Sequence, residues 1–371
     1  MKVLYIGYYK ENSDWGELSR NNILALDSAG VDVACRGVEM GASIQPEGRI
    51  LELEKKDIED CDVCIQHVFP DAVVGSTKFK KNIAILSNTF VSLRHSLAID
   101  YLKQVDEVWL PNTSYEQNLK DLLNTKVIPT PCDTEKFKRR YQDVNIPQVA
   151  GKFIFYAFIN SADANSIDSI FSSFHSEFDY CDNVCLVVVV TDPTEEAKNK
   201  VNQSAQVIKE QLNLNKNTSE FHREVIITDP QLDTGHLLAM HQSGHCFIGL
   251  TNNPSGNHGF DAIGLGSRAI LLDIGGNQNV LNAIDDEYVY PVSYILKSKK
   301  GASATLEMNC GKDFSCVSSD QDLKKGMRQF YEEWLKNPVA FENSTKSAGF
   351  SACEAFSMQK AGEKMKEIIN D

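Results

Sequence analysis

The sequence predicts an α/β protein built from two facing, doubly wound, Rossmann-like domains with a cleft between them. Short apolar runs alternate with longer amphipathic stretches along the chain. A polar linker interrupts this alternation near the middle, and the alternation then starts again. The length of 371 residues suits about two domains. Alternating strands and helices form parallel sheets that carry helices on both faces.

The first half of the chain contains six short apolar runs with the length of strands. A helix over residues 18–28 is expected to end at Gly30, because glycine is a common C-terminal cap. A second helix is expected over 115–123. The predicted strands are 2–8, 31–36, 63–67, 82–86, 107–111 and 126–129.

The second half repeats this pattern after a linker over 142–151, which is polar and contains Pro147. We therefore place the domains at 1–145 and 152–345. Asn337 and Pro338 are expected to interrupt a helical tail over 321–336 and 352–369. The other predicted strands are 153–158, 184–190, 224–228, 245–250 and 268–272, and the other predicted helices are 166–178, 194–212 and 232–242.

Composition and charge make several classes of partner unfavourable. The net charge is −14, which disfavours binding to nucleic acid or to an anionic membrane. No run approaches the ~20 apolar residues of a membrane-spanning helix. The first residues enter a strand pattern and lack the layout of a signal peptide, so we expect a cytoplasmic protein. The ten cysteines are scattered, several within apolar runs, as expected for buried thiols in a reducing compartment.

No metal or cofactor is expected from the spacing of possible ligands. Cys61 and Cys64 have Cys-x-x-Cys spacing, but they open an apolar strand and have no partner pair. His236, His241 and His245 follow one another without a carboxylate or cysteine pattern that completes a site. The long loop 7–16 lacks Gly-x-Gly-x-x-Gly, and the chain has no P-loop and no Gly-x-Ser-x-Gly. Nicotinamide dehydrogenases, P-loop ATPases and α/β-hydrolases are therefore disfavoured.

The most informative segment follows the predicted strand 245–250. A loop of small residues that includes Gly256, Asn257, His258 and Gly259 enters a short helix. A helix N-terminus with accessible amides binds anions such as a diphosphate. Asp261 lies within this helix, close enough to accept hydrogen bonds from a ribose diol. The other interpretation is a simple strand–helix–strand connection whose glycines allow close packing.

This segment resembles the nucleotide-sugar site of retaining GT-B glycosyltransferases of family four. With Gly266 on the late glycine of that family's pattern, Asp261 matches its second glutamate and Asn253 its first. Further stretches are similar to the family in the same order along the chain. They are 62–67, 105–114, 127–137 and 356–358.

The resemblance implies transfer of a sugar from a nucleoside-diphosphate sugar, with retention of configuration. In the family the leaving phosphate takes the proton of the acceptor, so neither a protein nucleophile nor a metal is needed. The first domain would hold the acceptor, and the second would bind the nucleotide sugar. A final helix, about 352–371, would cross back to the first domain.

The residues expected at the site come from both domains. His67 ends a strand of the first domain and matches the family position that contacts the transferred sugar, although a strand-end histidine can also serve structure alone. Asn253 is expected on the sugar and Asp261 on the ribose. The diphosphate is expected at Gly256, Asn257, His258 and Gly259. The acceptor-side candidates are Trp15, Gly16, Asn88 and Thr89, of which Trp15 could also simply pin its loop.

Two departures from the family pattern keep other functions open. Both glutamates are replaced, and residues 158–165 lack the arginine and lysine that usually face the diphosphate. The negative charge of the diphosphate would then be stabilised by backbone amides at 256–259 or by a cation elsewhere in the chain, such as Arg268. The alternatives are a non-catalytic relative that binds a glycan or partner, an epimerase or phosphorylase acting on nucleotide sugars, and a periplasmic-type binding protein. A saccharide, a lipid-linked sugar, a protein side chain and a modified nucleic-acid base all stay open as acceptors, the last disfavoured by charge.

Overall fold

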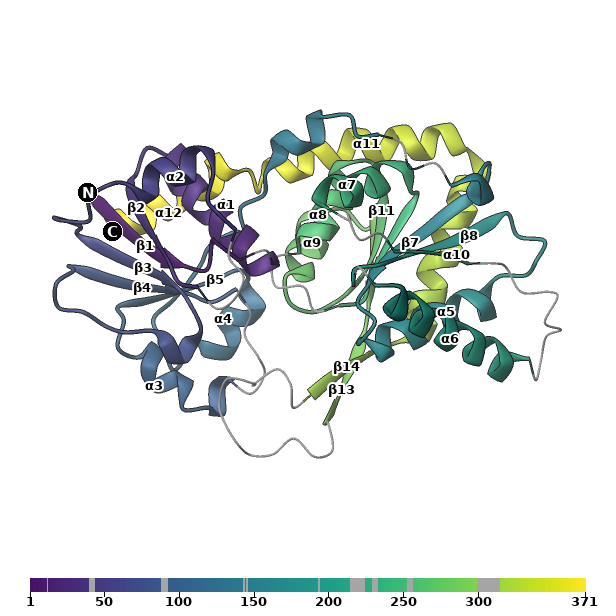
Figure 1. Ribbon diagram of the computed structural model, residues 1–371, viewed down its shortest axis with the longest axis horizontal. Coiled ribbons are helices and arrows are strands. Elements are labelled where there is room, and N and C mark those ends of the chain that lie inside the picture. The colour runs from purple at the N-terminus through teal and green to yellow at the C-terminus, as the bar shows by residue number, and fades with distance from the viewer. Residues whose placement is uncertain are drawn as a thin grey trace.

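The computed structural model contains two α/β domains, each built on a six-stranded parallel sheet (Figure 1). It describes residues 1–11, 13–39, 44–87, 93–142, 144, 146–192, 194–213, 224–228, 233–251, 256–298 and 314–371. The predicted fold class is confirmed. Among the described residues, no helix is both long and apolar enough to span a bilayer.

The first domain has the strand order β2-β1-β3-β4-β5-β6. Helices α1, α2 and α12 pack on one face of its sheet, and α3 and α4 on the other. The elements of this domain are β1 (Lys2–Gly7), α1 (Asp14–Ser28), β2 (Asp32–Gly37), α2 (Gly48–Glu54), β3 (Val63–His67), β4 (Lys81–Ile85), α3 (Ala98–Leu102), β5 (Glu107–Leu110), α4 (Thr113–Leu119) and β6 (Thr125–Val127).

The second domain has the strand order β12-β11-β10-β7-β8-β9. Helices α5, α6 and α10 pack on one face, and α7, α8 and α9 on the other. Every residue of the central strands β7 and β8 is buried, which explains their continuous apolar sequences. The elements of its sheet are β7 (Phe153–Ile159), α5 (Ala164–Glu177), β8 (Val184–Val190), α6 (Glu195–Leu212), β9 (Val225–Ile227), α7 (Thr234–Ser243), β10 (Cys246–Gly249), α8 (Asn257–Gly264), β11 (Arg268–Leu272), α9 (Asn277–Ala283) and β12 (Val289–Val292).

An antiparallel hairpin of β13 (Tyr294–Ser298) and β14 (Phe314–Ser318) follows the second sheet, and three helices end the chain. They are α10 (Asp320–Lys336), α11 (Pro338–Glu354) and α12 (Met358–Asn370). The break at Asn337 and Pro338 is as expected. The last helix begins later than the expected 352, because α11 continues to Glu354 and Ser357 caps α12. In Figure 1, α11 runs along the second domain and α12 lies against the first.

Helix α12 packs so tightly on α1 that a glycine is required at the crossing. A Cβ atom on Gly362 would lie 1.9 Å from the carbonyl oxygen of Ala25. We expect Gly362→Ala to destabilise the protein by about 1–3 kcal/mol through overpacking, although alanine is the better helix former. Gly235→Ala in α7 is the control, since the nearest atom there belongs to the side chain of Asp233. A Gly362→Ala protein that melts at or above the wild-type temperature would contradict this packing.

Candidate functional site

Each sheet has one point where the strand order reverses, and ligands of doubly wound sheets bind outside the carboxyl ends of the strands at such points. In the first sheet the reversal lies between β1 and β3, where Gly7 pairs with His67. In the second it lies between β7 and β10, which lead into α5 and α8. The binding positions are thus the starts of α1, α5 and α8.

Two hydrogen bonds join the carboxyl edges of the two sheets. Asn112 follows β5 and donates through Nδ2 to the carbonyl oxygen of Gly275, 3.2 Å away, just before α9. Asn279 in α9 donates to the hydroxyl of Thr130, which follows β6, at 3.0 Å. The carboxyl edges of the two domains therefore face each other.

Helix α8 begins after a glycine in the left-handed region. Gly256 has φ of 69°, and a Cβ atom there would lie 2.4 Å from the carbonyl oxygen of Gly276. Only glycine allows both this conformation and this approach. Gly259 lies one turn further, where a Cβ atom would meet Val280 and Leu271 at 3.0 and 3.1 Å. The glycines of this segment thus allow the close packing expected of a strand–helix–strand connection. They also allow α8 to begin at the carboxyl edge of the sheet.

Asp261 lies on α8 with its side chain buried, and its carboxylate forms an ion pair that the sequence analysis missed. The Nζ atom of Lys136 lies 2.5 Å from Oδ1 of Asp261, and only 7% of Lys136 is exposed. Burial alone would lower the pKa of Lys136, but the charge of Asp261 and its neighbours outweighs burial and holds that pKa above its usual value. Lys136 lies within the stretch 127–137, which resembles the family. The sequence drew attention to this stretch but did not predict the contact between Lys136 and Asp261.

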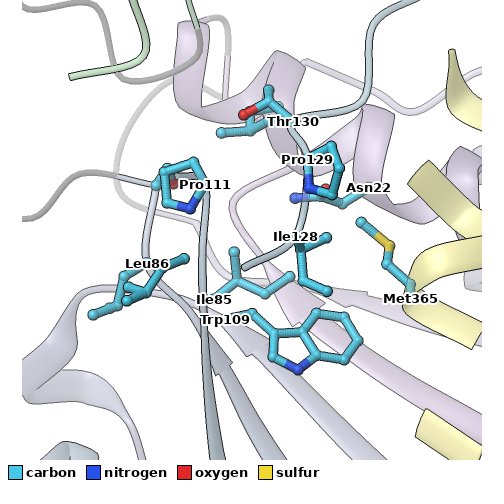
Figure 2. Close-up of a pocket in the computed structure, with 12 residues that line it drawn as sticks. Asn22, Ile85, Leu86, Trp109, Pro111, Ile128, Pro129, Thr130 and Met365 are labelled. Carbon is cyan, nitrogen blue, oxygen red and sulfur yellow. The ribbon is translucent and has the colours of Figure 1, made fainter. Parts of the chain in front are cut away.

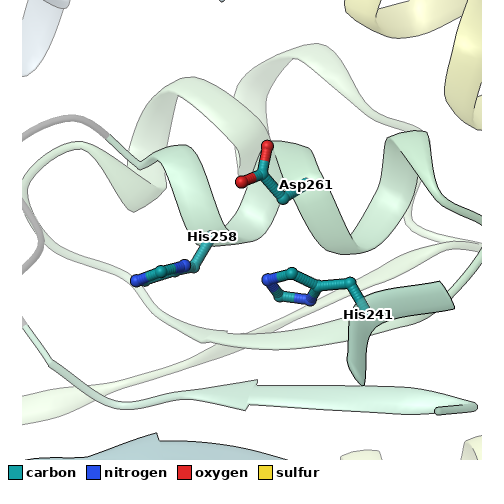
Figure 3. Close-up of side chains that lie close together, drawn as sticks. All are labelled: His241, His258 and Asp261. Carbon is teal, nitrogen blue, oxygen red and sulfur yellow. The ribbon is translucent and has the colours of Figure 1, made fainter. Parts of the chain in front are cut away.

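The side chain of His258 lies beside Asp261 and beside His241 of α7 (Figure 3). The His258 ring meets the ring of Phe158 edge-on, at 5.1 Å between centroids. Burial keeps the pKa of His241 well below its usual value, so its imidazole is neutral. His241, His258 and Asp261 therefore form a small polar cluster beside α8.

The loop after β7 brings no cation to this edge. Asp163 caps α5 by accepting a hydrogen bond from the amide of Ser166, so a carboxylate already occupies this helix start. Arg268 also lies elsewhere, at the amino end of β11, where its guanidinium packs over Phe341 and pairs with Glu333. The alternative that Arg268 supplies charge to the diphosphate is therefore wrong. The start of α8 is the better anion position of the two.

His67 lies at the reversal point of the first sheet and is almost completely buried. Its Nδ1 atom shares a hydrogen bond of 2.9 Å with the hydroxyl of Tyr5, and its Nε2 atom is bonded to the hydroxyl of Ser87. Both ring nitrogens thus have protein partners. A contact between His67 and a sugar stays a prediction and would require one of these bonds to open.

Trp15 and Gly16 lie in the first turn of α1, so the expectation of a long loop over 7–16 is wrong. Ser13 caps the helix by accepting a hydrogen bond from the amide of Gly16. The indole of Trp15 stacks on the ring of His67, with centroids 6.1 Å apart, and contacts Phe69. Trp15 therefore covers His67. The acceptor-side roles of Trp15 and Gly16 stay predictions.

Burial lowers the pKa of His67 to about 4, which predicts a specific loss of stability in acid. An unfolded histidine has a pKa near 6.5, so the unfolded state binds the proton more tightly and stability falls as the pH drops from about 6.5 to about 4. We expect His67 to account for about 2 kcal/mol of lost stability between pH 7 and pH 5.

Urea unfolding at these two pH values measures this loss. His67→Gln should reduce the difference between pH 7 and pH 5, whereas His236→Gln should retain it, because the His236 side chain is 54% exposed. An unchanged difference in His67→Gln would rule out this source of acid sensitivity.

A small cavity lies at the carboxyl edge of the first sheet (Figure 2). Ile85, Trp109 and Ile128 form its floor near the strand ends, and Met365 of α12 closes one side. Its volume of about 20 Å³ has room for roughly one water molecule and not for a sugar. It is a packing gap of the first domain rather than a substrate pocket.

Of the other expected site residues, Asn257 and Gly259 lie at the start of α8 with Gly256 and His258. Asn253, Asn88 and Thr89 fall outside the described residues. The fold therefore brings the diphosphate candidates and Asp261 together on one short helix, and His67 and Trp15 together in the other domain. What each of these residues binds stays a prediction.

Comparisons with known proteins identify the fold. No family model matches the sequence, and no curated protein matches it. OtsA trehalose-6-phosphate synthase aligns with 100% of this chain and 99% of its own, with 8% identity and a TM-score of 0.64. The UDP-forming α,α-trehalose-phosphate synthase of Burkholderia xenovorans aligns over 100% of both chains, at 9% identity and a TM-score of 0.64. Anabaena HepE, solved with UDP and glucose, aligns with 100% of this chain and 99% of its own, at 11% identity and a TM-score of 0.60. These are GT-B structures, and the chain has the GT-B fold.

Proposed function

We propose that the protein is a glycosyltransferase that moves a sugar from a nucleoside-diphosphate sugar to an acceptor, with retention of configuration. The observation that carries the proposal is that the whole chain aligns with GT-B transferases. The start of α8, which follows a left-handed glycine at the edge facing the other domain, supports it. HepE was solved with UDP-glucose, so UDP-glucose is the first donor to test.

In this proposal the start of α8 holds the diphosphate. The positive end of the helix dipole and the backbone amides at 256–259 would stabilise the leaving phosphate as charge develops. Within this turn Gly259 donates to the carbonyl oxygen of Gly256. Asn253 would contact the sugar, and the first domain, with His67, Trp15, Gly16, Asn88 and Thr89, would face the acceptor.

The role of Asp261 on the ribose depends on its ion pair. Its carboxylate has two oxygens, and Lys136 lies against one of them. A ribose diol would have to reach the second oxygen or displace Lys136. The family four assignment, retention and a metal-free reaction rest on the sequence resemblance. A cytoplasmic location is supported by the nine described cysteines, which are all free.

Turnover in the absence of an acceptor tests the proposal, because water then replaces the acceptor. UDP-glucose is incubated with the protein, and ¹H NMR follows the release of UDP and the anomer of free glucose. We expect α-glucose to appear before mutarotation. Initial β-glucose would contradict retention, and no release with any nucleotide sugar or added acceptor would contradict the transferase.

A non-catalytic relative that binds a glycan or partner is the second candidate. The observation that favours it is the loop after β7, where Asp163 rather than a cation lies at the helix start. Such a protein would bind a sugar or partner without releasing a nucleotide, so the same NMR experiment separates the two functions.

A further inference from the structure

A second cavity, with a volume of about 500 Å³, lies at the end of α8 opposite to the proposed diphosphate position. The residues just before the linker, the ends of α7 and α8, and α11 form it. Small-molecule pockets usually measure roughly 300–1,000 Å³, so this cavity has room for more than a single inorganic ion. Its charged lining residues are Arg139, Arg140 and Lys346, and none of the described residues that line it is acidic.

This group of cations contrasts with the charge of the whole chain, which is −14. Arg139 and Lys346 are exposed, and neither forms an ion pair with another residue in the described ranges. Lys138, in the adjacent turn, instead pairs with Glu135. A concave surface that carries one sign of charge concentrates ions of the opposite sign. The cavity is therefore suited to an anion.

The backbone that carries the two arginines is held in place by α7. Gln242 donates through Nε2 to the carbonyl oxygen of Tyr141 at 3.2 Å, and its Oε1 atom accepts from the amide of Tyr141 at 3.0 Å. The amide of Arg139 donates to the carbonyl oxygen of Lys136 at 3.3 Å. The guanidinium groups thus extend from a fixed backbone, which lowers the conformational cost of binding a ligand.

Two glycines allow the other walls of the cavity to lie close to the end of α8. A Cβ atom on Gly264 would lie 2.6 Å from the ring of Phe137. A Cβ atom on Gly266 would lie 2.5 Å from Cγ of Lys346, and Gly266 has φ of 98°, which favours glycine. The ring of Phe137 and the aliphatic stem of Lys346 therefore pack against this turn. The ring gives the cavity an apolar wall beside its cations.

We propose that this cavity binds a small organic phosphate, with the phosphate group on Arg139, Arg140 and Lys346 and the organic part against Phe137. Guanidinium groups bind phosphate oxygens through paired hydrogen bonds, and an ammonium group adds a further positive charge. The site is separate from the proposed donor site, because the eight residues of α8 place about 12 Å between the two ends of the helix.

The cavity also lies near the two places where the chain passes between the domains. Cys132 pairs with Ser357 in a parallel β-bridge, so the two passages run side by side. The two arginines follow the first passage, and Lys346 lies on α11, which leads into the second and on to α12 (Figure 1). A phosphate bound by all three cations would tie these two passages together.

Calorimetric titration with phenyl phosphate and with inorganic phosphate tests the site. Phenyl phosphate supplies both the anion and an apolar ring, so we expect one equivalent to bind at least about tenfold more tightly than inorganic phosphate. Arg139→Gln and Lys346→Gln should each weaken this binding by about tenfold, through loss of a charged hydrogen bond. Both side chains are exposed, so each variant should melt as the wild type does.

Lys138→Gln is the matched control, because it removes the same charge from an adjacent exposed position outside the cavity. It should bind phenyl phosphate like the wild type. Equal weakening in Lys138→Gln and Arg139→Gln would reduce the effect to net charge and overturn the site. No saturable binding of phenyl phosphate, or equal affinity for the two probes, would overturn it as well.

Titration with UDP separates this site from the proposed function. The double variant Arg139→Gln with Lys346→Gln should lose phenyl phosphate binding and keep the wild-type affinity for UDP. Loss of both ligands in this variant would place the cations in the donor site and overturn a separate cavity. Phenyl phosphate binding, with the expected loss in the variants, by a protein that binds no UDP would support this site and count against the transferase alone.

Discussion

Replacing Lys136 with methionine is expected to destabilise the protein by about 3–5 kcal/mol, because it leaves the carboxylate of Asp261 buried without a partner. Asp261→Asn should destabilise the protein by a similar amount, because it leaves the ammonium group of Lys136 buried without its partner. The double variant Lys136→Met with Asp261→Leu should cost much less than the sum, since no charge is then left buried. Urea unfolding followed by tryptophan fluorescence measures all three.

Lys138→Met is the matched control in the same turn. Its ion pair with Glu135 is exposed, with 54% of the lysine side chain accessible, so a change of at most about 1 kcal/mol is expected. The loss in Lys136→Met should also shrink at low pH, where Asp261 can take up a proton. A buried pair would be contradicted if the losses in unfolding free energy of the two single variants add up to that of the double variant. Equal losses in Lys136→Met and Lys138→Met would also contradict it.

Gly256→Ala is expected to weaken nucleotide binding by about tenfold or more. The variant forces a side chain into the left-handed region and against the carbonyl oxygen of Gly276. Strain of about 1–3 kcal/mol would be relieved by shifting the start of α8, where the diphosphate is proposed to lie. Calorimetric titration of the nucleotide that the protein prefers measures the effect.

The chain offers a close control for the backbone strain. Gly151 has φ of 72°, almost that of Gly256, but nothing lies within 4 Å of the position of its Cβ atom. Gly151→Ala should therefore lose some stability and keep its nucleotide affinity. If both variants bind the nucleotide as the wild type does, the start of α8 does not hold it.

Local sequence patterns were sufficient to predict the fold class, although they did not predict the hairpin of β13 and β14 or the helix α11. Strands β7 and β8 are continuous apolar runs, which predicts that they are buried. Their parallel orientation follows from the alternation of strands and helices along the chain. The sequence did not predict the short helices α2 and α3, because their lengths of seven and five residues are too short to show a helical period. The start of α1 was placed too late, since the apolar pattern begins at Leu18 while the helix is set by the cap at Ser13.

The site was less accessible to sequence analysis because its contacts are not local. Gly256 and Asp261 could be found from the family pattern and lie on one helix as expected. The ion pair between Lys136 and Asp261 links residues far apart in the chain, and no spacing rule predicts it. The burial of His67 beneath Trp15 likewise depends on how α1 packs against the carboxyl end of β3.

The central claim is that the second domain binds a nucleoside diphosphate at the start of α8. A thermal-shift panel of wild-type protein with UDP, GDP, ADP, CMP and their sugar conjugates tests it most directly. A ligand that binds only the folded state adds about 2.7 kcal/mol of stability at a hundredfold excess over Kd. The account predicts a selective rise in melting temperature with one nucleoside diphosphate and its sugar conjugate. A cooperative melt that no nucleotide shifts would contradict it.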